Sequence, residues 1–270
     1  MSDSSNLALK ARRRVLELGL RAGRNGSHQG SGMSIVDILS VLYGGVLNVS
    51  KENLSSPERD RFILSKGHAA VALYAVLELN GFLTPEQTST FESNGTSYYA
   101  HAHRDVSRGI EFSGGSLSLG LSFGVGVALC CKKVGLNNRI VVLVGDGECD
   151  EGLVWESAMA AANFSLANLT VIVDCNGMQS DGVKSEIMNQ FSVADKFRAF
   201  GFAVAEIDGH RHDAIEDALR LRHESRPVAI VASTVKGKGI AFMEDDPDWH
   251  HGILTQTLFD AAMAELDGRP

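Results

Sequence analysis

The stretch that decides the fold is RIVVLVGDGECDEGLVWESAMAAANFSLANLTVIVD, residues 139–174. It begins with a run rich in β-branched residues, Arg139–Val144, and ends with a second one, Leu169–Asp174. Neither run alternates apolar and polar residues, which is typical of central parallel strands that are covered on both faces. Between them, Leu153–Asn163 has the apolar spacing of a helix. The stretch therefore predicts two parallel strands joined by a crossover helix.

Weaker signals on either side extend this pattern. Further strands are predicted at Val228–Ser233 and Ala203–Ile207. Helices are predicted at Leu7–Gly23, Ser34–Tyr43, Gly67–Asn80, Leu117–Lys132, Asp213–Glu224 and Thr255–Leu266. Strands that alternate with helices predict an α/β fold, with a doubly wound, mostly parallel sheet and helices on both of its faces. We expect a single domain over residues 1–270, with an N-terminal helical extension.

Some local predictions are specific enough to test. Leu9, Leu16 and Leu20 of the first helix share one face, and the three arginines at 12–14 are expected to lie on the opposite face. The Gly/Ser-rich residues 23–32 are expected to form a loop, and Ser34 to cap the helix that follows. The helix predicted over Leu117–Lys132 is so apolar that we expect it to be buried on most sides.

Composition narrows the class of protein. Of the 270 residues, 44% are hydrophobic and 21% charged, and the formal net charge is −8. The negative charge argues against a general nucleic-acid surface or a surface for anionic membranes. No apolar run approaches the length of a membrane span, and no signal-peptide core follows the N-terminal basic cluster. We expect a soluble, cytoplasmic protein that binds neither nucleic acid nor membrane.

The four cysteines form no CxxC pair and no zinc-type spacing. Adjacent Cys130 and Cys131 lie in a helical run and are expected to be buried packing residues. Cys149 and Cys175 flank the polar residues discussed next, so they are expected to approach each other. A disulfide or soft-metal site between them and a pair of inert reduced thiols are the two alternatives.

Polar residues follow the two strands of the deciding stretch. Gly145-Asp146-Gly147 ends the first strand, and Asn176 follows the second, so the crossover brings the two strand ends side by side or one strand apart. A carboxylate, an amide oxygen and a loop carbonyl are ligands for Mg²⁺ or Ca²⁺, with phosphate oxygens completing the shell. A Gly-Asp-Gly triplet alone is ordinary turn chemistry, but this combination predicts a metal–phosphate site. No GxGxxG or GxxxxGK[ST] run follows a strand, which argues against a nucleotide site.

The segment 145–182, GDGECDEGLVWESAMAAANFSLANLTVIVDCNGMQSDG, resembles the thiamine diphosphate motif of transketolases, and most closely that of the N-terminal subunit of split, two-chain transketolases. The resemblance covers nearly the whole chain. Four more segments carry it in order: SHQGSGMSIVDILSVLY (27–43), RFILSKGHAAVALYAVL (61–77), GIEFSGGSLSLGLSFGVGVAL (109–129) and VKGKGIAFMEDDPDWHHG (235–252). It implies a thiamine diphosphate-binding fold of the diphosphate-binding type.

The resemblance also implies roles for particular residues. Asp146, Asn176 and the carbonyl oxygen of Met178 would bind the divalent metal, Mg²⁺ or Ca²⁺. The cofactor would be contacted by the glycines of the GDG triplet and by residues that match known cofactor positions: Gly115, Leu117, Gly145, Gly147, Glu151 and Asn176. Among these, Gly147 would face the diphosphate, Gly115 and Leu117 the cofactor rings, and Glu151 would lie near the subunit interface.

Four of the nine histidines match positions that line the substrate channel in this family: His28, His68, His101 and His250. Neutral or switchable imidazoles suit a reaction that moves protons on and off sugar hydroxyls near neutral pH. Three histidines late in the chain, His210, His212 and His223, are expected to be solvated and to have no catalytic role.

The chain departs from the family pattern at several positions. Gln29 and Ala102 stand where the family usually has proline, and His251 stands where split transketolases usually have glycine. In the glycine-rich segment, Ser118 and Leu119 replace a glycine and a polar residue. These changes suggest the hypothesis of a less polar or non-phosphorylated acceptor.

The catalytic glutamate of transketolases belongs to a second, pyrimidine-binding domain, and nothing resembling that domain is present. The resemblance therefore implies that the chain transfers a two-carbon ketol unit from a ketose to an aldehyde only with a partner chain that carries this domain. We expect an α₂β₂ heterotetramer acting on small sugars or aldehydes. The alternatives are a subunit of a 2-oxoacid dehydrogenase, a deoxyxylulose-phosphate-synthase-like enzyme, and a non-catalytic scaffolding subunit. The SKGHA and WH segments favour transketolase.

Overall fold

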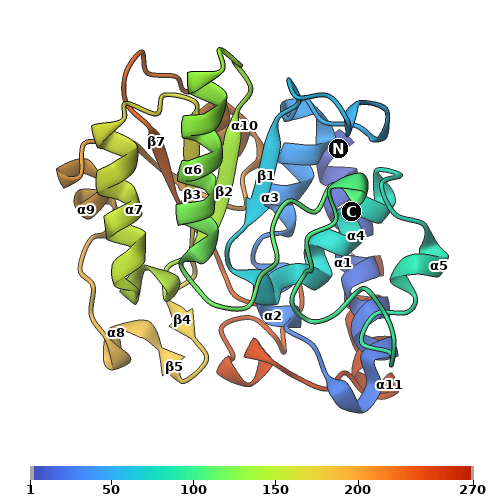
Figure 1. Cartoon of the computed structure of the whole chain (residues 1–270). Helices are drawn as coiled ribbons and strands as arrows, with labels where there is room; N and C mark the ends of the chain where they lie inside the picture. Colours follow the sequence, from blue (N-terminus) through green and yellow to red (C-terminus); the bar gives the residue numbers. More distant parts are fainter. Residues whose placement is uncertain (1–2, 269–270) are drawn as a thin grey trace.

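A central parallel sheet organises the chain (Figure 1). The computed structural model describes residues 3–268, so the outermost residues of the predicted domain, 1–2 and 269–270, lie outside the described part. The five strands lie in the order β1 (Arg61–Leu64), β2 (Ile140–Gly145), β3 (Leu169–Cys175), β7 (Val228–Ser233) and β6 (Ala203–Asp208), and all neighbours are parallel. The predicted fold class is confirmed; the single domain over 1–270 stays a prediction.

The strands bury side chains on both faces of the sheet. Because successive side chains of a strand point to opposite faces, Val141 and Leu143 of β2 join one core and Val142 and Val144 join the other. The first core is covered by α1 (Asp3–Ala22), α3 (Val36–Val41), α4 (Ala70–Leu79), α10 (His212–Arg220) and α11 (Gln256–Asp267). The second is covered by α6 (Leu119–Lys133), α7 (Gly152–Asn163) and α9 (Val193–Ala199). This two-sided burial explains why the strands read as unbroken apolar runs.

Short elements complete the chain. The helices α2 (Gln29–Met33), α5 (Pro85–Thr88) and α8 (Lys184–Ile187) join the others, and β4 (Met178–Gln179) pairs with β5 (Gly182–Val183) as a small hairpin. No helix within residues 3–268 is long and apolar enough to cross a membrane.

The strands predicted from β-branched runs all form, whereas β1 was not predicted. Its four residues are too few to show a period, and it is recognisable only through its pairing with β2. The predicted helices form with ends shifted by a few residues, the usual uncertainty of helix boundaries. The predicted helix Asp213–Glu224 is shortened most at its C-terminal end, where the observed helix α10 already ends at Arg220.

Several local predictions are wrong, and for two of the polar side chains the structure shows a tertiary partner. Helix α2 begins inside the predicted loop 23–32. Ser34 does not cap α3, because the N-cap residue of this helix is Ile35; the hydroxyl of Ser34 instead donates to Asp174 on the sheet at 2.8 Å. Arg12 is buried rather than solvated, because its guanidinium pairs with Asp37. Each polar side chain turns inward to a charge that is distant in sequence.

Helix α6 is also less buried than its composition predicts. Its buried residues form one stripe that includes Leu121, Val125 and Cys131, whereas Cys130 is exposed, contrary to prediction. Leu119 at its start is 45% exposed, and Met159 of α7 is 52% exposed. The two helices therefore present apolar side chains on the outside of the described molecule.

Two features of the fold position the site. Gly145 lies opposite Asp174 in the β2–β3 register, so the loops after these two strands leave the same edge side by side, as predicted. The glycine-rich segment before α6 packs against the segment after β1, where a Cβ on Gly67 would lie 2.7 Å from Gly114 Cα. Glycine at both positions permits this close backbone approach.

Candidate active site

A cavity of about 360 Å³ lies at the carboxyl ends of β2 and β3. This is the edge at which parallel α/β sheets place their ligands. All the residues predicted for the site line this one cavity, namely His28, His68, His101, Gly115, Leu117, Gly145, Asp146, Gly147, Glu151, Asn176, Met178 and His250. The structure thus brings the predicted residues together, and their individual roles stay predictions.

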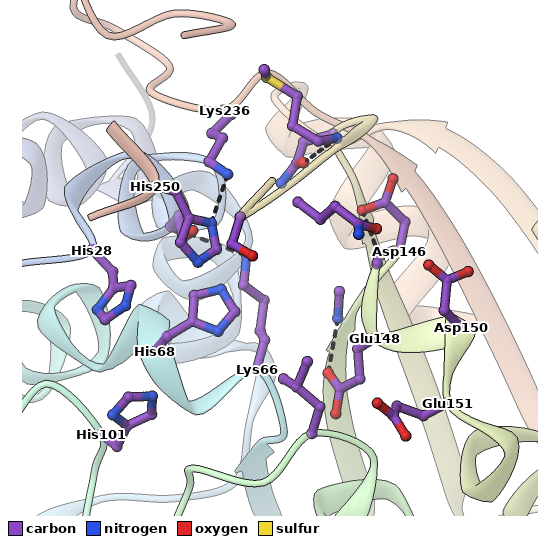
Figure 2. Close-up of a pocket in the computed structure, with 18 of the residues that line it drawn as sticks. His28, Lys66, His68, His101, Asp146, Glu148, Asp150, Glu151, Lys236 and His250 are labelled. Carbon is purple, nitrogen blue, oxygen red and sulfur yellow. Dashed lines mark hydrogen bonds between the residues drawn. The ribbon is translucent and has the colours of Figure 1, made fainter. Parts of the chain in front are cut away.

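One wall of the cavity is a cluster of imidazoles (Figure 2). The ring centroid of His28 lies 5.4 Å from that of His68 and 5.5 Å from those of His101 and His250. The rings of His68 and His250 are 5.1 Å apart. His251 adds a fifth ring, 4.6 Å from His28. We call the four cavity-lining rings, His28, His68, His101 and His250, the histidine wall.

The histidine wall is uncharged near neutral pH. Burial, followed by the positive charge of neighbouring groups, lowers the pKa of His28 to about 3 and that of His250 to about 4. Burial also lowers the pKa of His68 and, more weakly, that of His101. Neutral imidazoles each carry one N–H donor and one nitrogen acceptor. The wall can therefore both donate to and accept from the hydroxyl groups of a substrate.

The opposite wall is built from the loops after β2 and β3, residues 145–178, and we call it the carboxylate wall. Asp146 accepts hydrogen bonds from the backbone N–H of Gly147 and of Gly177, each at 2.9 Å, and Lys184 Nζ lies 3.9 Å away. Burial raises the pKa of Asp146, and the charge of Lys184 partly offsets this. The carboxylate therefore lies in an environment that favours a cation beside it.

Asn176 is oriented by its neighbours. Its Nδ2 donates to Asp174 Oδ2 at 3.0 Å, and its Oδ1 accepts from the backbone N–H of Met178 at 3.0 Å. Among residues 3–268, no group of three His, Cys, Asp or Glu side chains could hold a metal. A metal here would depend on Asp146 together with an amide oxygen and a carbonyl. These hard oxygen donors fit Mg²⁺ or Ca²⁺, with ligand phosphates completing the shell.

Two buried lysines, missed by the sequence analysis, lie between the walls. Lys66 Nζ forms an ion pair with Asp174 and donates to the carbonyl of Ser31 at 3.3 Å. Lys236 Nζ lies 2.9 Å from His250 Nδ1 (Figure 2). Burial and the charge of Lys66 lower the pKa of Lys236 to about 8. Both amines line the cavity and suit an anionic ligand such as a diphosphate.

The position of Lys66 could have been predicted from the sequence. Lys66 follows β1 by two residues, so recognising this strand would have placed the lysine at the ligand edge of the sheet. Asp174 behind it is fully buried and also accepts from the hydroxyls of Ser34 and Thr234. Burial raises the pKa of Asp174, but Lys66 and these hydrogen bonds outweigh it and lower the pKa overall. Asp174 thus fixes both Lys66 and Asn176.

Glu148, also missed, ties the glycine-rich segment to the sheet. Its carboxylate accepts from Ser65 Oγ at 2.5 Å, from the backbone N–H of Ser118 at 2.6 Å and from that of Gly145 at 3.1 Å. Burial raises its pKa. Ser118 adopts the left-handed conformation, φ 71°, in which an L-residue is strained. The segment that carries Gly115 and Leu117 is therefore held beside the cavity.

The structure also shows the surroundings of the cysteines and of two histidines outside the cavity. All four cysteines are free. Burial raises the pKa of Cys175 to about 11, and it also raises the pKa of Cys149 well above its usual value. Such thiols fit the inert alternative. The prediction of solvated side chains is wrong for His210 and His212, which are 14% and 15% exposed and contact Asp37.

Comparisons with known proteins agree with this geometry. A family model described as "Transketolase, thiamine diphosphate binding domain" matches residues 6–265. The chain is 40% identical over 242 residues to the 6-deoxy-6-sulfo-D-fructose transketolase subunit SqwG of Clostridium sp. (strain MSTE9), covering 89% of this chain and 88% of the relative. It is 36% identical over 265 residues to an apulose-4-phosphate transketolase subunit of Phocaeicola vulgatus, covering 96% and 92%.

Solved structures show the same fold. The transketolase from Leishmania mexicana superposes with a TM-score of 0.91 at 24% identity, over 99% of this chain and 42% of that one. The transketolase from Campylobacter jejuni gives a TM-score of 0.87 at 26% identity and again is covered to 42%. This chain thus spans less than half of these transketolases. It belongs to the transketolase family, as a thiamine diphosphate-binding chain of a transketolase-type enzyme.

Proposed function

We propose that the chain binds thiamine diphosphate with Mg²⁺ and, with a partner chain, transfers a two-carbon ketol unit from a ketose to an aldehyde. The observation that carries this proposal is the meeting of two complementary walls in one cavity. The carboxylate wall offers metal ligands, and the histidine wall offers neutral hydrogen-bonding groups. The two lysines between them offer positive charge to a diphosphate.

The residues present fit such a cofactor. Asp146, Asn176 and the carbonyl of Met178 would hold the metal, with Lys66 and Lys236 at the diphosphate. Gly147 lines the same cavity and would also approach the diphosphate. Gly115, Leu117, Gly145 and Glu151 would complete the cofactor site. When bound, thiamine diphosphate supplies the electron sink, and the protein supplies orientation and electrostatics.

The histidine wall would handle the substrate. A neutral imidazole can donate its N–H to a substrate carbonyl or alkoxide and accept a proton from a hydroxyl through its other nitrogen. Lys236 donates to His250 Nδ1, which leaves the N–H of His250 on Nε2. With pKa values of about 3 and 4, His28 and His250 stay neutral throughout the physiological range. Their protons are therefore available as hydrogen-bond donors without a charge.

A partner chain would complete the site. Leu117 lines the cavity and is 37% exposed, so apolar surface reaches the cavity itself. Further exposed apolar side chains lie on α6, α7 and the segment after β5: Leu119, Met159, Ile187, Met188 and Phe191. Exposed apolar side chains of this size are the kind that a protein–protein interface would cover. The relatives named above are described as subunits, which supports the need for a partner chain. We propose that this partner carries the pyrimidine-binding domain and that the two chains form an α₂β₂ heterotetramer in the cytoplasm.

The substrate would be a small sugar or sugar-like molecule. The relatives act, by their names, on 6-deoxy-6-sulfo-D-fructose and apulose 4-phosphate. In this chain the unusual residues lie at the edge of the site. Ser118 bonds back to the carbonyl of Leu117, and Leu119 faces outward. Only His251 contacts the histidine wall. We therefore expect His251 to influence the acceptor more than Ser118 and Leu119 do.

The test is titration calorimetry followed by an activity assay. The chain is co-expressed with a candidate pyrimidine-domain chain, and thiamine diphosphate is titrated in with and without Mg²⁺. We expect Mg²⁺-dependent binding and ketol transfer by the complex, and no transfer by either chain alone. Binding without Mg²⁺ dependence would contradict the metal site. Failure of the complex to bind at all would favour a scaffolding role.

A further inference from the structure

A buried charge cluster lies outside the cavity, on the face of the sheet covered by α1 and α3. Asp37 accepts two hydrogen bonds from Arg12, at 3.0 and 2.6 Å, one from His210 Nδ1 at 2.8 Å and one from His212 Nε2 at 3.0 Å. The carboxylate side chain is 7% exposed. Burial would raise its pKa, but the hydrogen bonds and the charge of Arg12 outweigh it and hold the pKa far below the usual range.

Two of these partners, Arg12 and His210, also form hydrogen bonds with one turn, residues 235–238. Arg12 Nε donates to the carbonyl of Lys238 at 3.1 Å. The backbone N–H of Val235 donates to His210 Nε2 at 2.9 Å. Both ends of the turn are thereby tied to one buried carboxylate. We call Asp37, Arg12 and His210 the Asp37 clamp.

The turn carries a residue of the candidate active site. Lys236 lies between the two tied ends, and its amine reaches the cavity and bonds to His250 (Figure 2). The backbone N–H of Gly237 also donates to the carbonyl of Gly30 at 2.9 Å, close to the helix that follows His28. A small shift of this turn would move the amine away from the cavity. An error of about 1 Å in placing a catalytic group is costly.

We propose that the Asp37 clamp positions Lys236 for the anionic end of the cofactor. The proposal rests on the proposed function of the cavity. His210 is the central member, because its two ring nitrogens join the carboxylate of Asp37 to the backbone of the turn. Its Nε2 accepts from Val235, so its proton lies on Nδ1 and is held there by Asp37. In many proteins a carboxylate accepts a hydrogen bond from one ring nitrogen of a histidine. The tautomer is then fixed, and the other ring nitrogen is free to accept.

The test uses two replacements of His210 that each keep one half of its hydrogen bonding. The amide of His210→Asn can reproduce the Nδ1 contact with Asp37 but not the contact with Val235. The longer His210→Gln can place an acceptor where Nε2 lies. His212→Gln is the matched control, since His212 contacts the same carboxylate and bonds Ser4 instead of the turn. Amide hydrogen exchange at Val235 is measured on the chain without cofactor.

We expect exchange at Val235 to rise about tenfold in His210→Asn, and to stay within about twofold of wild type in His210→Gln and His212→Gln. The affinity of the chain–partner complex for Mg²⁺–thiamine diphosphate should fall about tenfold in His210→Asn alone. Equal exchange in the two His210 variants, or equal loosening in His212→Gln, would overturn the proposal. If wild type binds no cofactor, the proposed function fails, and the exchange result still decides the clamp.

Discussion

The two walls of the cavity differ in how the chain builds them. The carboxylate wall comes from one continuous stretch, residues 145–178, in which two adjacent strand ends place Asp146 and Asn176 together. The histidine wall is assembled from four separate segments of the chain, and His28 and His250 are separated by more than two hundred residues. The first wall therefore depends on local topology, whereas the second depends on the packing of the whole chain. Four experiments test this difference between the two walls.

The largest effect is expected at the junction of the walls, where Lys66 pairs with Asp174. Lys66→Met leaves a fully buried carboxylate without its cation, which costs about 3–5 kcal/mol of stability. The free energy of unfolding in urea measures the loss. The double variant with Asp174→Asn should recover much of it. Additive losses in the double variant would show that the pair is not coupled.

Within the carboxylate wall, Asp146→Asn keeps the side-chain volume but removes the charge. We expect the affinity for Mg²⁺–thiamine diphosphate to fall about 100-fold, since the metal loses its anionic protein ligand. Calorimetry on the complex measures the change, and the variant should fold normally. His103→Gln, outside the cavity-lining set, is the control, and affinity close to wild type in Asp146→Asn would refute the metal assignment.

The histidine wall should make stability depend on pH. The pKa of His28 is lowered from 6.5 to about 3 in the fold, so the unfolded chain binds more protons between these values. Stability therefore rises with pH over this window and is lost as pH falls below about 6.5, by up to about 1.4 kcal/mol per pH unit for one such group. Thermal unfolding at pH 7 and pH 5 measures the slope. His28→Gln should flatten it, and an unchanged slope would contradict burial of a neutral ring.

The smallest effect is expected beside the carboxylate wall, at Ser118. Because its φ of 71° is strained for a residue with a Cβ, Ser118→Gly should stabilise the chain by about 0.5–1 kcal/mol. The matched control is Ser116→Gly, at a position without positive φ within the same segment. Urea unfolding compares the two. A gain at both positions, or at neither, would show that backbone strain is not the cause.

Sequence patterns predicted most of the fold because the strands are buried on both faces, which leaves a signature in composition alone. They also predicted the meeting of Asp146 with Asn176, since adjacent parallel strands end at one edge. The histidines were assigned only through resemblance to a family, because no spacing along the chain relates His28 to His68, His101 or His250. Their shared cavity became visible in the structure.

The amino-acid sequence was sufficient to predict the parallel sheet and the sheet edge at which ligands bind. It also carries the resemblance to transketolases. The tertiary structure alone decided which polar side chains turn inward. Arg12, Asp37 and His210 have the local pattern of solvated residues, yet they pair inside the fold. Lys66 and Lys236 are buried in the same way at the cavity. The physical reason is that a buried charge requires a partner, and the partner lies far away along the chain, where local periodicity carries no information.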